Sequence, residues 1–437
     1  MGSRDPLPQL TMTMANDPLR HRGYLHIDEP PTRSAIAAAV SNPERVAKWS
    51  FLPLITNIRV IRKLRRKGAS FVIKEKRRAI SYASHRDAAL YAYYSAKLTK
   101  LYEQRLRKLQ LDEIVTAFRT GDGRCNIHFA HEAFEWIDAN RPCVALAYDI
   151  SGFFDNLDHL LLRRKWCDVL GTSSLPSDHY ALYRSLTRFS TVPQVTLYAT
   201  FGISMHAPKA SGRTRACTPK EFRERIADAG YLQVHQEAKG IPQGTPLSAV
   251  LSNIYMLDFD EQLAAQVNAW NGLYRRYCDD VLCIVPPDQA EKVKSLIESL
   301  VASIKLEVQP EKLEECHFGL PGTTSKPALQ YLGLTYDGRR VRLRSGGVAR
   351  FYNRIRKGVR KADRARTKVA NVRGVAKKSV PIKRGRLNRS YLYVGPRNFV
   401  SYAARAARIA HSPAIRDQIA RRAQAINEAI QHADETQ

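Results

Sequence analysis

Three aspartates stand beside apolar segments at two places in the chain. Asp149 follows the apolar run Cys143–Tyr148, which is typical of a buried strand. Asp279 and Asp280 are adjacent and lie between YRR and VLCIV, two short strand-like segments. Adjacent carboxylates disfavour joint ionisation unless a cation compensates them. If the strand ends meet, three carboxylates can hold two Mg²⁺ ions about 3.5–4 Å apart, an arrangement suited to in-line phosphoryl chemistry.

Each of these motifs also has an ordinary structural interpretation. Asp149 alone is equally well explained as a helix N-cap after a strand. The Asp279-Asp280 pair could be a solvated hairpin turn, although VLCIV is typical of a core strand and argues for a site near the interior. A third motif, GIPQGTPLS (residues 240–248), forms a tight loop whose glycines allow close approach to a ligand, or else a plain junction into the following helix.

The charge of the chain favours a polyanionic partner. The 437 residues include 70 Lys and Arg against 41 Asp and Glu, a net charge of +29. Nucleic acid is the commonest partner of so basic a protein, and an ordinary protein of basic composition is the alternative. Residues 339–437 supply +21 of this charge, and a second basic cluster spans 59–78. The sequence therefore predicts an acidic centre flanked by two basic arms.

Composition disfavours a secreted, disulfide-bonded or membrane-spanning protein. The seven cysteines are scattered and include no CxxC pair, which suits a reducing compartment. No apolar run reaches the roughly 18–20 residues that cross a bilayer, and the polar N-terminus shows no apolar leader segment. With 44% hydrophobic residues, we expect a folded cytoplasmic chain of about three domains or subdomains.

Hydrophobic periodicity predicts a mixture of helices and strands. We expect 1–35 to be extended or loosely packed, Ile36–Arg65 to be mostly helical with breaks at Pro43 and Pro53, and Ser70–Tyr82 to form a short strand pair. Further helices are predicted at Ala88–Leu109, His159–Leu170, Pro246–Val267, Gln289–Ile304 and after Ala349. Further strands are predicted at Cys143–Tyr148, Leu273–Tyr277 and Val281–Val285, with a hairpin of Leu329–Tyr336 and Arg340–Leu343. Residues 171–239 show no pattern that assigns them.

Three segments taken together resemble the palm motifs of reverse transcriptases. YDISGFFDNLDH (148–159), GIPQGTPLSAVLSNIYM (240–256) and YCDD (277–280) occur in the order of motifs A, B and C. LEVQPEKLEE (306–315) is similar to motif D, LQYLGLTYDG (329–338) resembles motif E, and FVIKEKRRAISYA (71–83) looks like the basic fingers segment. The joint match covers about residues 55–345 and is far more specific than any single motif. Two departures are Cys278 within the turn and the 91-residue gap from Asp149 to Gly240.

The resemblance implies roles for individual residues. Asp149 and Asp279 would ligate both metal ions, and Asp280 would be a more peripheral carboxylate. The backbone carbonyl of Ile150 would complete one coordination shell. Lys312 matches the motif D lysine, a candidate general acid for pyrophosphate, with a helix-end surface lysine as the alternative. The residues implied to contact the incoming dNTP are Lys76, Arg78, Phe154 and Gln243.

Phe154 is the implied determinant of sugar specificity. It stands five residues after Asp149, where an aromatic ring would clash with a ribose 2′-hydroxyl and so favour dNTP over rNTP. Core packing is the alternative for this ring, and Phe153 is the better candidate for the core. For Lys76 and Arg78 the alternative is a solvated basic strand.

The implied fold is an α+β right-hand polymerase with fingers, a palm of antiparallel sheet plus helices, and an α-helical thumb. The expected boundaries are an N-terminal extension 1–35, fingers 36–140, palm 141–345 with a fingers insertion around 171–239, and thumb 346–437. The thumb would grip a template–primer duplex by backbone-directed cations. The candidates are Arg354, Arg356, Lys357, Arg360, Lys361 and Arg364. A solvated basic face is the alternative. Tyr391, Tyr393 and Phe399 either stack bases or pack between thumb helices.

The resemblance implies an RNA-directed DNA polymerase that uses two Mg²⁺ ions, dNTPs, a primer and an RNA template, and that holds an RNA–DNA duplex. The motifs are most similar to those of the bacterial defence-associated reverse transcriptases of class 2. That subclass implies cDNA synthesis from a dedicated non-coding RNA in anti-phage defence. A group II intron maturase, a retron enzyme and a template-independent abortive-infection polymerase remain open. A non-catalytic RNA-binding protein is disfavoured by the three intact carboxylates.

Overall fold

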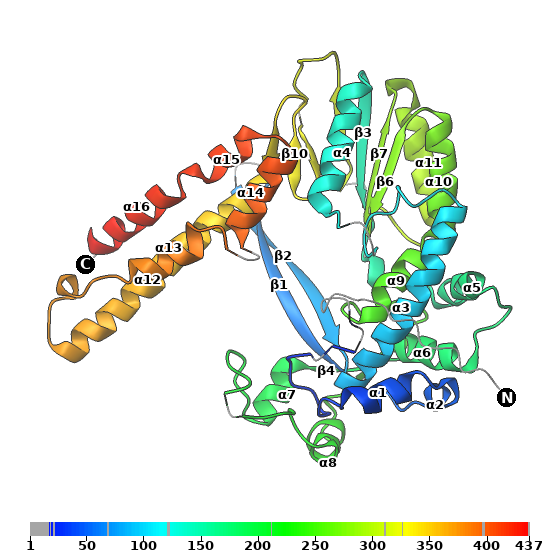
Figure 1. Ribbon diagram of the computed structural model, residues 1–437, viewed down its shortest axis with the longest axis horizontal. Helices are drawn as coiled ribbons and strands as arrows, with labels where there is room; N and C mark the ends of the chain where they lie inside the picture. The colour runs from blue at the N-terminus through cyan, green and yellow to red at the C-terminus, as the bar shows by residue number, and fades with distance from the viewer. Residues whose placement is uncertain are drawn as a thin grey trace.

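The computed structural model describes residues 17, 19–20, 22–67, 70–119, 123–210, 212–309, 312–325, 327–395 and 398–435. The expected N-terminal extension therefore lies partly outside the described residues. Helices and strands are arranged around three separate sheets, with the C-terminal helices extending away from the rest of the molecule (Figure 1). Within the described residues, no helix combines the length and apolarity that a membrane span requires.

The first sheet is built on a long two-stranded ribbon. β1 (Leu54–Lys67) and β2 (Ser70–Tyr82) pair antiparallel along their whole length, from Ile55 opposite Tyr82 to Lys67 opposite Ser70. β4 (Ser190–Pro193) runs parallel to the base of β1, and β5 (Gln233–Val234) pairs with β4. The surrounding helices are α1 (Arg33–Val40), α2 (Pro43–Ala47), α6 (Ser177–Thr187), α7 (Gln194–Thr200) and α8 (Pro219–Phe222), with a short π-helical segment η2 (Arg223–Ala227).

The ribbon overturns two of the predictions. The helix predicted for Ile36–Arg65 ends at Ala47, and the residues from Leu54 onward form β1. Ser70–Tyr82 is one strand of 13 residues paired with β1, not a short strand pair. Both faces of a free ribbon reach solvent, so cations occur on both faces and blur the alternation that marks a half-buried strand. The β-branched residues between the cations were the signal for a strand.

Two segments without a clear sequence pattern complete this sheet. Ile27 from the N-terminal extension, Ile55 of β1 and Val192 of β4 are buried in one small core with α7 and η2. The extension is also held by hydrogen bonds, because the carboxylate of Asp28 accepts from the backbone N–H groups at the start of α3 (His85–Lys108). Loose packing was therefore wrong for Leu25–Ile27, which are buried, while residues 22–32 form neither helix nor strand, in line with the extended alternative. Its apolar run Tyr24–Ile27 is too short for a periodicity to be read.

The second sheet has the strand order β6-β7-β3-β8 and is antiparallel throughout. Its strands are β3 (Cys143–Asp149), β6 (Leu273–Tyr277), β7 (Asp280–Val285) and β8 (Glu314–Phe318). Val144 and Leu146 enter a core on one face, while Cys143 and Ala145 enter a core on the other. Burial on both faces explains why this strand reads as a continuous apolar run.

Helices cover both faces of this second sheet. They are α3, α4 (Asn126–Ala139), α5 (His159–Leu170), α9 (Pro246–Tyr255), α10 (Leu257–Ala269) and α11 (Ala290–Ser303), with the short 3₁₀ turn η3 (Pro287–Gln289). The helix predicted for Pro246–Val267 is two helices that meet at Met256. The helices predicted at Ala88–Leu109, His159–Leu170 and Gln289–Ile304 are present as α3, α5 and α11, with ends shifted by at most three residues.

The third sheet joins the second to the C-terminal helices. β9 (Leu329–Tyr331), β10 (Leu334–Tyr336) and β11 (Val341–Leu343) form an antiparallel meander in place of the predicted hairpin, because a turn at Leu332-Gly333 divides the first predicted strand. The C-terminal helices are α12 (Ser345–Arg373), α13 (Arg384–Tyr391), α14 (Phe399–Ile409), α15 (Pro413–Ala420) and α16 (Arg422–Glu435), with the short turn η5 (Lys377–Ser379). In Figure 1, α12 and α16 run side by side as a projecting arm.

Candidate active site

The three aspartates meet at one end of the second sheet. Asp149, the last residue of β3, is the cross-strand partner of Asp280, the first residue of β7. Directly opposed residues of an antiparallel pair have Cα atoms about 4.5–5.5 Å apart. Asp279 lies in the turn between β6 and β7, and its carbonyl accepts from the backbone N–H of Ile150 at 3.2 Å. The sheet register therefore brings all three aspartates and the backbone of Ile150 to the same end of the sheet.

The turn that carries Asp279 has a constrained backbone. Cys278 is buried and adopts a φ of +60°, the left-handed region that non-glycine residues seldom occupy. Its carbonyl accepts a hydrogen bond of 3.0 Å from Nη1 of Arg276. Because a left-handed non-glycine residue persists only where its surroundings fix it, this contact is part of what holds the turn.

Arg276 lies in a fully buried ion pair beside the turn. Its guanidinium and the carboxylate of Asp260 are both 0% exposed, and they form two hydrogen bonds of 2.6 and 2.7 Å. Asp260 on α10 also accepts from the hydroxyl of Tyr274 at 2.6 Å, and Asn253 on α9 accepts from the guanidinium at 3.1 Å. The Asp260 carboxylate raises the pKa of Arg276 despite its burial. The network ties the turn to the helices that follow the motif B loop.

The electrostatics of the three carboxylates call for positive charge. Although part of Asp280 reaches solvent, desolvation by the surrounding protein, followed by the charges of Asp279 and Asp149, raises its pKa to about 7. Arg344 and Arg78 oppose this shift, one from the start of α12 and one from β2. Carboxylate oxygens are the ligands that Mg²⁺ prefers, so the donor set and its charge fit a divalent metal. Among the described residues, however, no three acidic, histidine or cysteine side chains already converge as a metal cluster.

Lys312 occupies part of this end of the sheet. Its ammonium lies 2.8 Å from Oδ2 of Asp149, and both side chains are about one-third exposed. The segment that carries Lys312 is fixed against the residues after β3, because the N–H of Ser151 donates to the carbonyl of Glu307 at 2.8 Å and the amide of Gln309 donates to Oγ of Ser151 at 2.7 Å. Lys312 is thus a close neighbour of the carboxylates and not a remote surface lysine.

The segment after β3 places the candidate sugar gate. Phe153 and Phe154 lie in a 3₁₀ turn, η1 (Phe153–Asp155), which Gly152 enters with a φ of +51°. Phe153 is buried in the core, whereas Phe154 is half-buried and packs edge-on against Phe153 at 5.5 Å between ring centroids. The carbonyl of Phe154 accepts from the N–H of Ile241 at 2.9 Å, so the gate segment and the motif B loop are bonded to each other.

The motif B loop also contacts the base of the ribbon. The carbonyl of Gln243 accepts from the N–H of Ser81 at 2.8 Å. Gly244 has a φ of +118°, and a Cβ there would lie 2.5 Å from the carbonyl oxygen of Ser81. Glycine is therefore required by both backbone angle and space. Gln243 is in this way held between the palm and the fingers ribbon.

The fingers cations lie on one face of the ribbon. Residues of β2 two apart share a face, so Lys76 and Arg78 point to the same side. Both side chains are exposed. Each acts on a different part of the site, since Lys76 lowers the pKa of Asp155 beside the gate and Arg78 lowers that of Asp280, although desolvation keeps both pKa values above the ordinary range.

The thumb cations form a stripe along α12. All six predicted thumb residues are exposed. At 100° per residue, four of them share one narrow face with two further exposed cations that the sequence reading did not include. This stripe consists of Arg350, Arg354, Lys357, Lys361, Arg364 and Lys368. It is about 27 Å long at 1.5 Å per residue, while Arg356 and Arg360 lie on its flank.

The opposite face of α12 is buried at Phe351, Ile355 and Val359, in the core that also contains Ile426 and Ile430 of α16. Tyr391 and Phe399 join this packing, since Phe399 stacks on Phe351 at 4.7 Å, while Tyr393 is 62% exposed.

The sequence reading did not single out Arg276, Arg344 or His159. Arg276 stands directly before the YCDD motif, and an arginine inside an otherwise alternating buried strand was the available signal. His159 closes motif A and lies at the start of α5, where its Nε2 is 2.7 Å from the carbonyl oxygen of Gly240. Regular spacing of 4, 3, 4, 3 and 4 residues was the signal that would have completed the α12 stripe.

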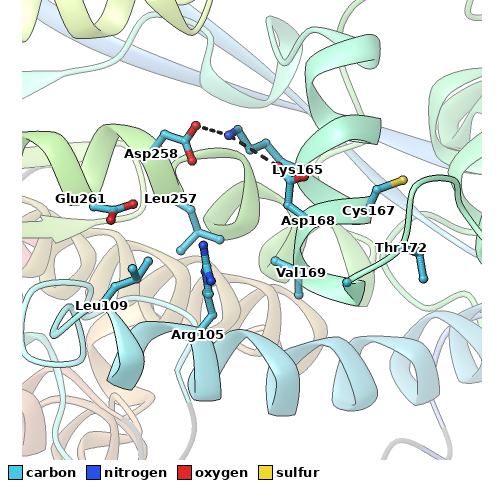
Figure 2. A pocket seen from close by; sticks show the side chains of 11 residues that line it. Arg105, Leu109, Lys165, Cys167, Asp168, Val169, Thr172, Leu257, Asp258 and Glu261 are labelled. Carbon is cyan, nitrogen blue, oxygen red and sulfur yellow. Dashed lines mark hydrogen bonds and ion pairs between the residues drawn. The ribbon is translucent and has the colours of Figure 1, made fainter.

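A separate cavity of about 370 Å³ lies between α3, α5 and α10, and none of Asp149, Asp279 and Asp280 lines it (Figure 2). Lys165 in its wall is ion-paired with Asp258 and lies 3.7 Å from Asp168. Arg105 and Glu261 also line it, so cations and anions are mixed there. This mixture of charges does not favour binding of a polyanion in the cavity.

Comparison with known proteins gives a partial family match. Residues 177–336 match the sequence model of the reverse transcriptase (RNA-dependent DNA polymerase) family, a range that contains motifs B and C but not Asp149. Together with the three sheets and the helical arm described above, this match confirms the predicted α+β right-hand fold. No curated protein matches the sequence.

Among solved structures, apo telomerase of Candida tropicalis truncated from its C-terminal domain is 13% identical, with a TM-score of 0.42 over 72% of this chain and 60% of that one. Telomerase of Candida albicans in complex with a TWJ fragment of telomeric RNA is 13% identical, with a TM-score of 0.41 over 74% of this chain and 53% of that one. The BmCPV RNA-dependent RNA polymerase at elongation state is 11% identical, with a TM-score of 0.42 over 74% of this chain and 26% of that one. The chain thus spans 60% or less of the length of these three structures.

Proposed function

We propose that the chain is an RNA-directed DNA polymerase that extends a primer by nucleotidyl transfer. The observation that carries the proposal is the register that sets Asp149 opposite Asp280 with Asp279 in the adjoining turn. The family match to residues 177–336 and the cationic stripe of α12 support it. Desolvation, followed by the charges of Asp279 and Asp149, raises the pKa of Asp280, so a bound cation would stabilise this end of the sheet.

The residues that would hold Mg²⁺ are Asp149, Asp279, Asp280 and the carbonyl of Ile150. When bound, two Mg²⁺ ions activate a primer 3′-hydroxyl and neutralise charge that develops on the leaving pyrophosphate. Asp149 must exchange its ion pair with Lys312 for this, since its Oδ2 now accepts from that ammonium at 2.8 Å. Lys312, freed from this ion pair, would be the candidate general acid that donates a proton to pyrophosphate.

The other residues bind and orient the substrates. Lys76 and Arg78 supply positive charge for the triphosphate from the exposed face of β2. Phe154 excludes a ribose 2′-hydroxyl, and Gln243 contacts the nascent base pair from the motif B loop. The α12 stripe binds the phosphates of the template–primer duplex without reading its sequence.

Primer extension on a generic RNA template tests this proposal. The native chain is expected to extend the primer with dNTPs and Mg²⁺ but not with rNTPs. The double variant Asp279→Ala/Asp280→Ala should bind the template–primer with unchanged affinity in low Mg²⁺ and make no product. A double variant that still makes product would refute the assignment of the carboxylates.

We further propose that the chain acts in anti-phage defence with a dedicated non-coding RNA as its template. The residues of motifs A to C, including the YCDD turn, support this subclass, and the basic arms suit a structured RNA partner. Sequencing of the RNA that co-purifies with the chain should return one dominant non-coding species. Expression of the native chain with that RNA should reduce phage plaques, and the Asp279→Ala/Asp280→Ala variant should not. Co-purification of intron RNA would favour the maturase instead.

A further inference from the structure

His159 lies between the two segments that would surround the sugar of an incoming nucleotide. Its backbone N–H donates to the carbonyl of Ala238 at 3.0 Å, and its ring Nε2 lies 2.7 Å from the carbonyl oxygen of Gly240. A carbonyl oxygen only accepts, so Nε2 is the donor. We propose that His159 is a positioning residue for sugar discrimination, holding the motif B loop at a fixed distance from Phe154; the proposal rests on the polymerase function above.

The backbone contacts show what the histidine holds together. The N–H of Gly240 donates to the carbonyl of Leu157 at 2.8 Å, and the N–H of Ile241 donates to the carbonyl of Phe154 at 2.9 Å. Gly240 has a φ of +91°, and a Cβ there would lie 2.8 Å from the carbonyl oxygen of Asp155. The segments 154–157 and 240–241 are therefore in direct backbone contact next to the imidazole hydrogen bond.

The imidazole is itself fixed from several sides. His159 is buried, and the hydroxyl of Tyr183 donates to its carbonyl at 3.0 Å. Its ring lies 5.9 Å from that of His235, which stacks on Phe189 and bonds through Nε2 to the carbonyl of Lys239 at 2.8 Å. Two histidines thus bond successive carbonyls of the same loop, at Lys239 and Gly240.

This arrangement has a consequence for specificity. A steric gate discriminates only if the ring cannot retreat when a 2′-hydroxyl presses against it. The carbonyl of Phe154 is anchored to Ile241, so movement of the loop moves the gate. Loss of the imidazole contact should therefore relax the gate while leaving the carboxylates and the fingers cations in place.

Two variants separate the hydrogen bond from the bulk of the ring. His159→Leu removes the donor, and His159→Gln keeps an N–H that can reach a carbonyl. The measurement is the ratio of kcat/KM for dNTP to that for rNTP in single-nucleotide incorporation. We expect the ratio to fall about 3–10-fold in His159→Leu, the equivalent of one hydrogen bond, and to recover to within about twofold in His159→Gln.

A matched control and a second readout keep the test decisive. His179→Leu removes another buried histidine, one that accepts from Trp166 on α5, and should leave the ratio unchanged. Hydrogen exchange of the Gly240 and Ile241 amides should be faster in His159→Leu and normal in His179→Leu, whether or not the chain polymerises nucleotides. An unchanged ratio in His159→Leu would overturn the inference, whatever the exchange rates of these amides.

The variant Phe154→Val separates this inference from the proposed function. If Phe154→Val admits rNTP and His159→Leu does not, the gate is right and the positioning role is wrong. If the native chain incorporates no nucleotide, the polymerase proposal fails, and faster exchange in His159→Leu would support only the anchoring of the loop. If Phe154→Val leaves the ratio unchanged, the gate assignment fails and the specificity role of His159 fails with it.

Discussion

Removal of the Arg276 guanidinium should destabilise the palm strongly. The substitution Arg276→Met keeps most of the side-chain volume but leaves the carboxylate of Asp260 buried with Tyr274 as its remaining partner among those described. Both charges of the pair are 0% exposed, so no water can replace the lost guanidinium without rearrangement. The substitution Arg276→Met also removes the hydrogen-bond donor to the carbonyl of Cys278, so the left-handed turn that carries Asp279 loses a restraint.

The magnitude follows from the burial of the pair. Breaking a buried ion pair by removing one partner costs about 3–5 kcal/mol, because an uncompensated charge remains. For a folding unit of 150–250 residues, each kcal/mol lowers Tm by about 2–4 °C. We therefore expect Arg276→Met to lower the Tm of the palm transition by about 6–20 °C.

Thermal unfolding followed by circular dichroism measures this effect. Arg275→Met is the matched control, because its guanidinium is only half-buried and bonds the carbonyl of Tyr274. It should cost less than about 1.5 kcal/mol. Replacing both charges, as in Arg276→Met/Asp260→Leu, should recover more than half of the lost Tm, since an apolar pair can replace a buried ion pair at little cost. A loss below about 3 °C in the single variant, or a double variant less stable than the single one, would refute this account.

Three further outcomes are expected. Gly244→Ala should cost about 1–3 kcal/mol or more in the free energy of unfolding and lower primer extension, because its φ of +118° is strained for alanine and its Cβ would collide with the carbonyl of Ser81. Gly230→Ala is the control for backbone strain alone, since Gly230 also has a positive φ but open space around its Cβ position. Equal losses for the two variants in urea unfolding would contradict the collision with Ser81. Burial lowers the pKa of His26 to about 3, so below pH 6.5 the unfolded chain binds a proton that the folded chain does not. Stability should then fall by about 1.4 kcal/mol per pH unit, and His26→Leu should flatten the decrease in Tm between pH 7.5 and 5; parallel curves would refute the assignment. Replacing three stripe cations with glutamine should reduce the slope of log K against log salt for duplex binding by about 2–3, whereas the same change at three cations on the last turn of α3 should leave the slope unchanged. The stripe set is Arg354, Lys361 and Arg364, and the control set is Arg105, Arg107 and Lys108.

The palm was the most predictable part of the fold. Cys143–Tyr148 read as a buried strand because both of its faces enter a core, and His159–Leu170 read as a helix because Asp158 caps it and Gly171 ends it. The fingers were less predictable. β1 pairs with β4 from more than a hundred residues away, and a strand two residues long, such as β5, has no periodicity to detect.

The candidate site was predictable in its residues but not in its contacts. Spacing identified Asp149, Asp279 and Asp280, yet only the register shows that Asp149 and Asp280 are direct partners. The ion pair of Lys312 with Asp149 joins residues 163 positions apart and depends on a loop path that no local pattern encodes. His159 was visible at the end of motif A, but its role depends on Gly240, whose approach is set by backbone angles rather than by side-chain type.

The parallel pairing of β1 with β4 imposes an order on biosynthesis. Leu54–Thr56 must wait for Thr191–Pro193, which leave the ribosome on the order of 10 s later at ordinary rates of translation. During that interval the inner edge of β1 is an unpaired strand edge, the kind of surface that invites wrong pairings. The charge arrives later still, because residues 339–437 supply +21 of the net +29. The nascent chain can therefore complete its fingers and palm while the basic cluster at 59–78 is the main part of it that attracts RNA.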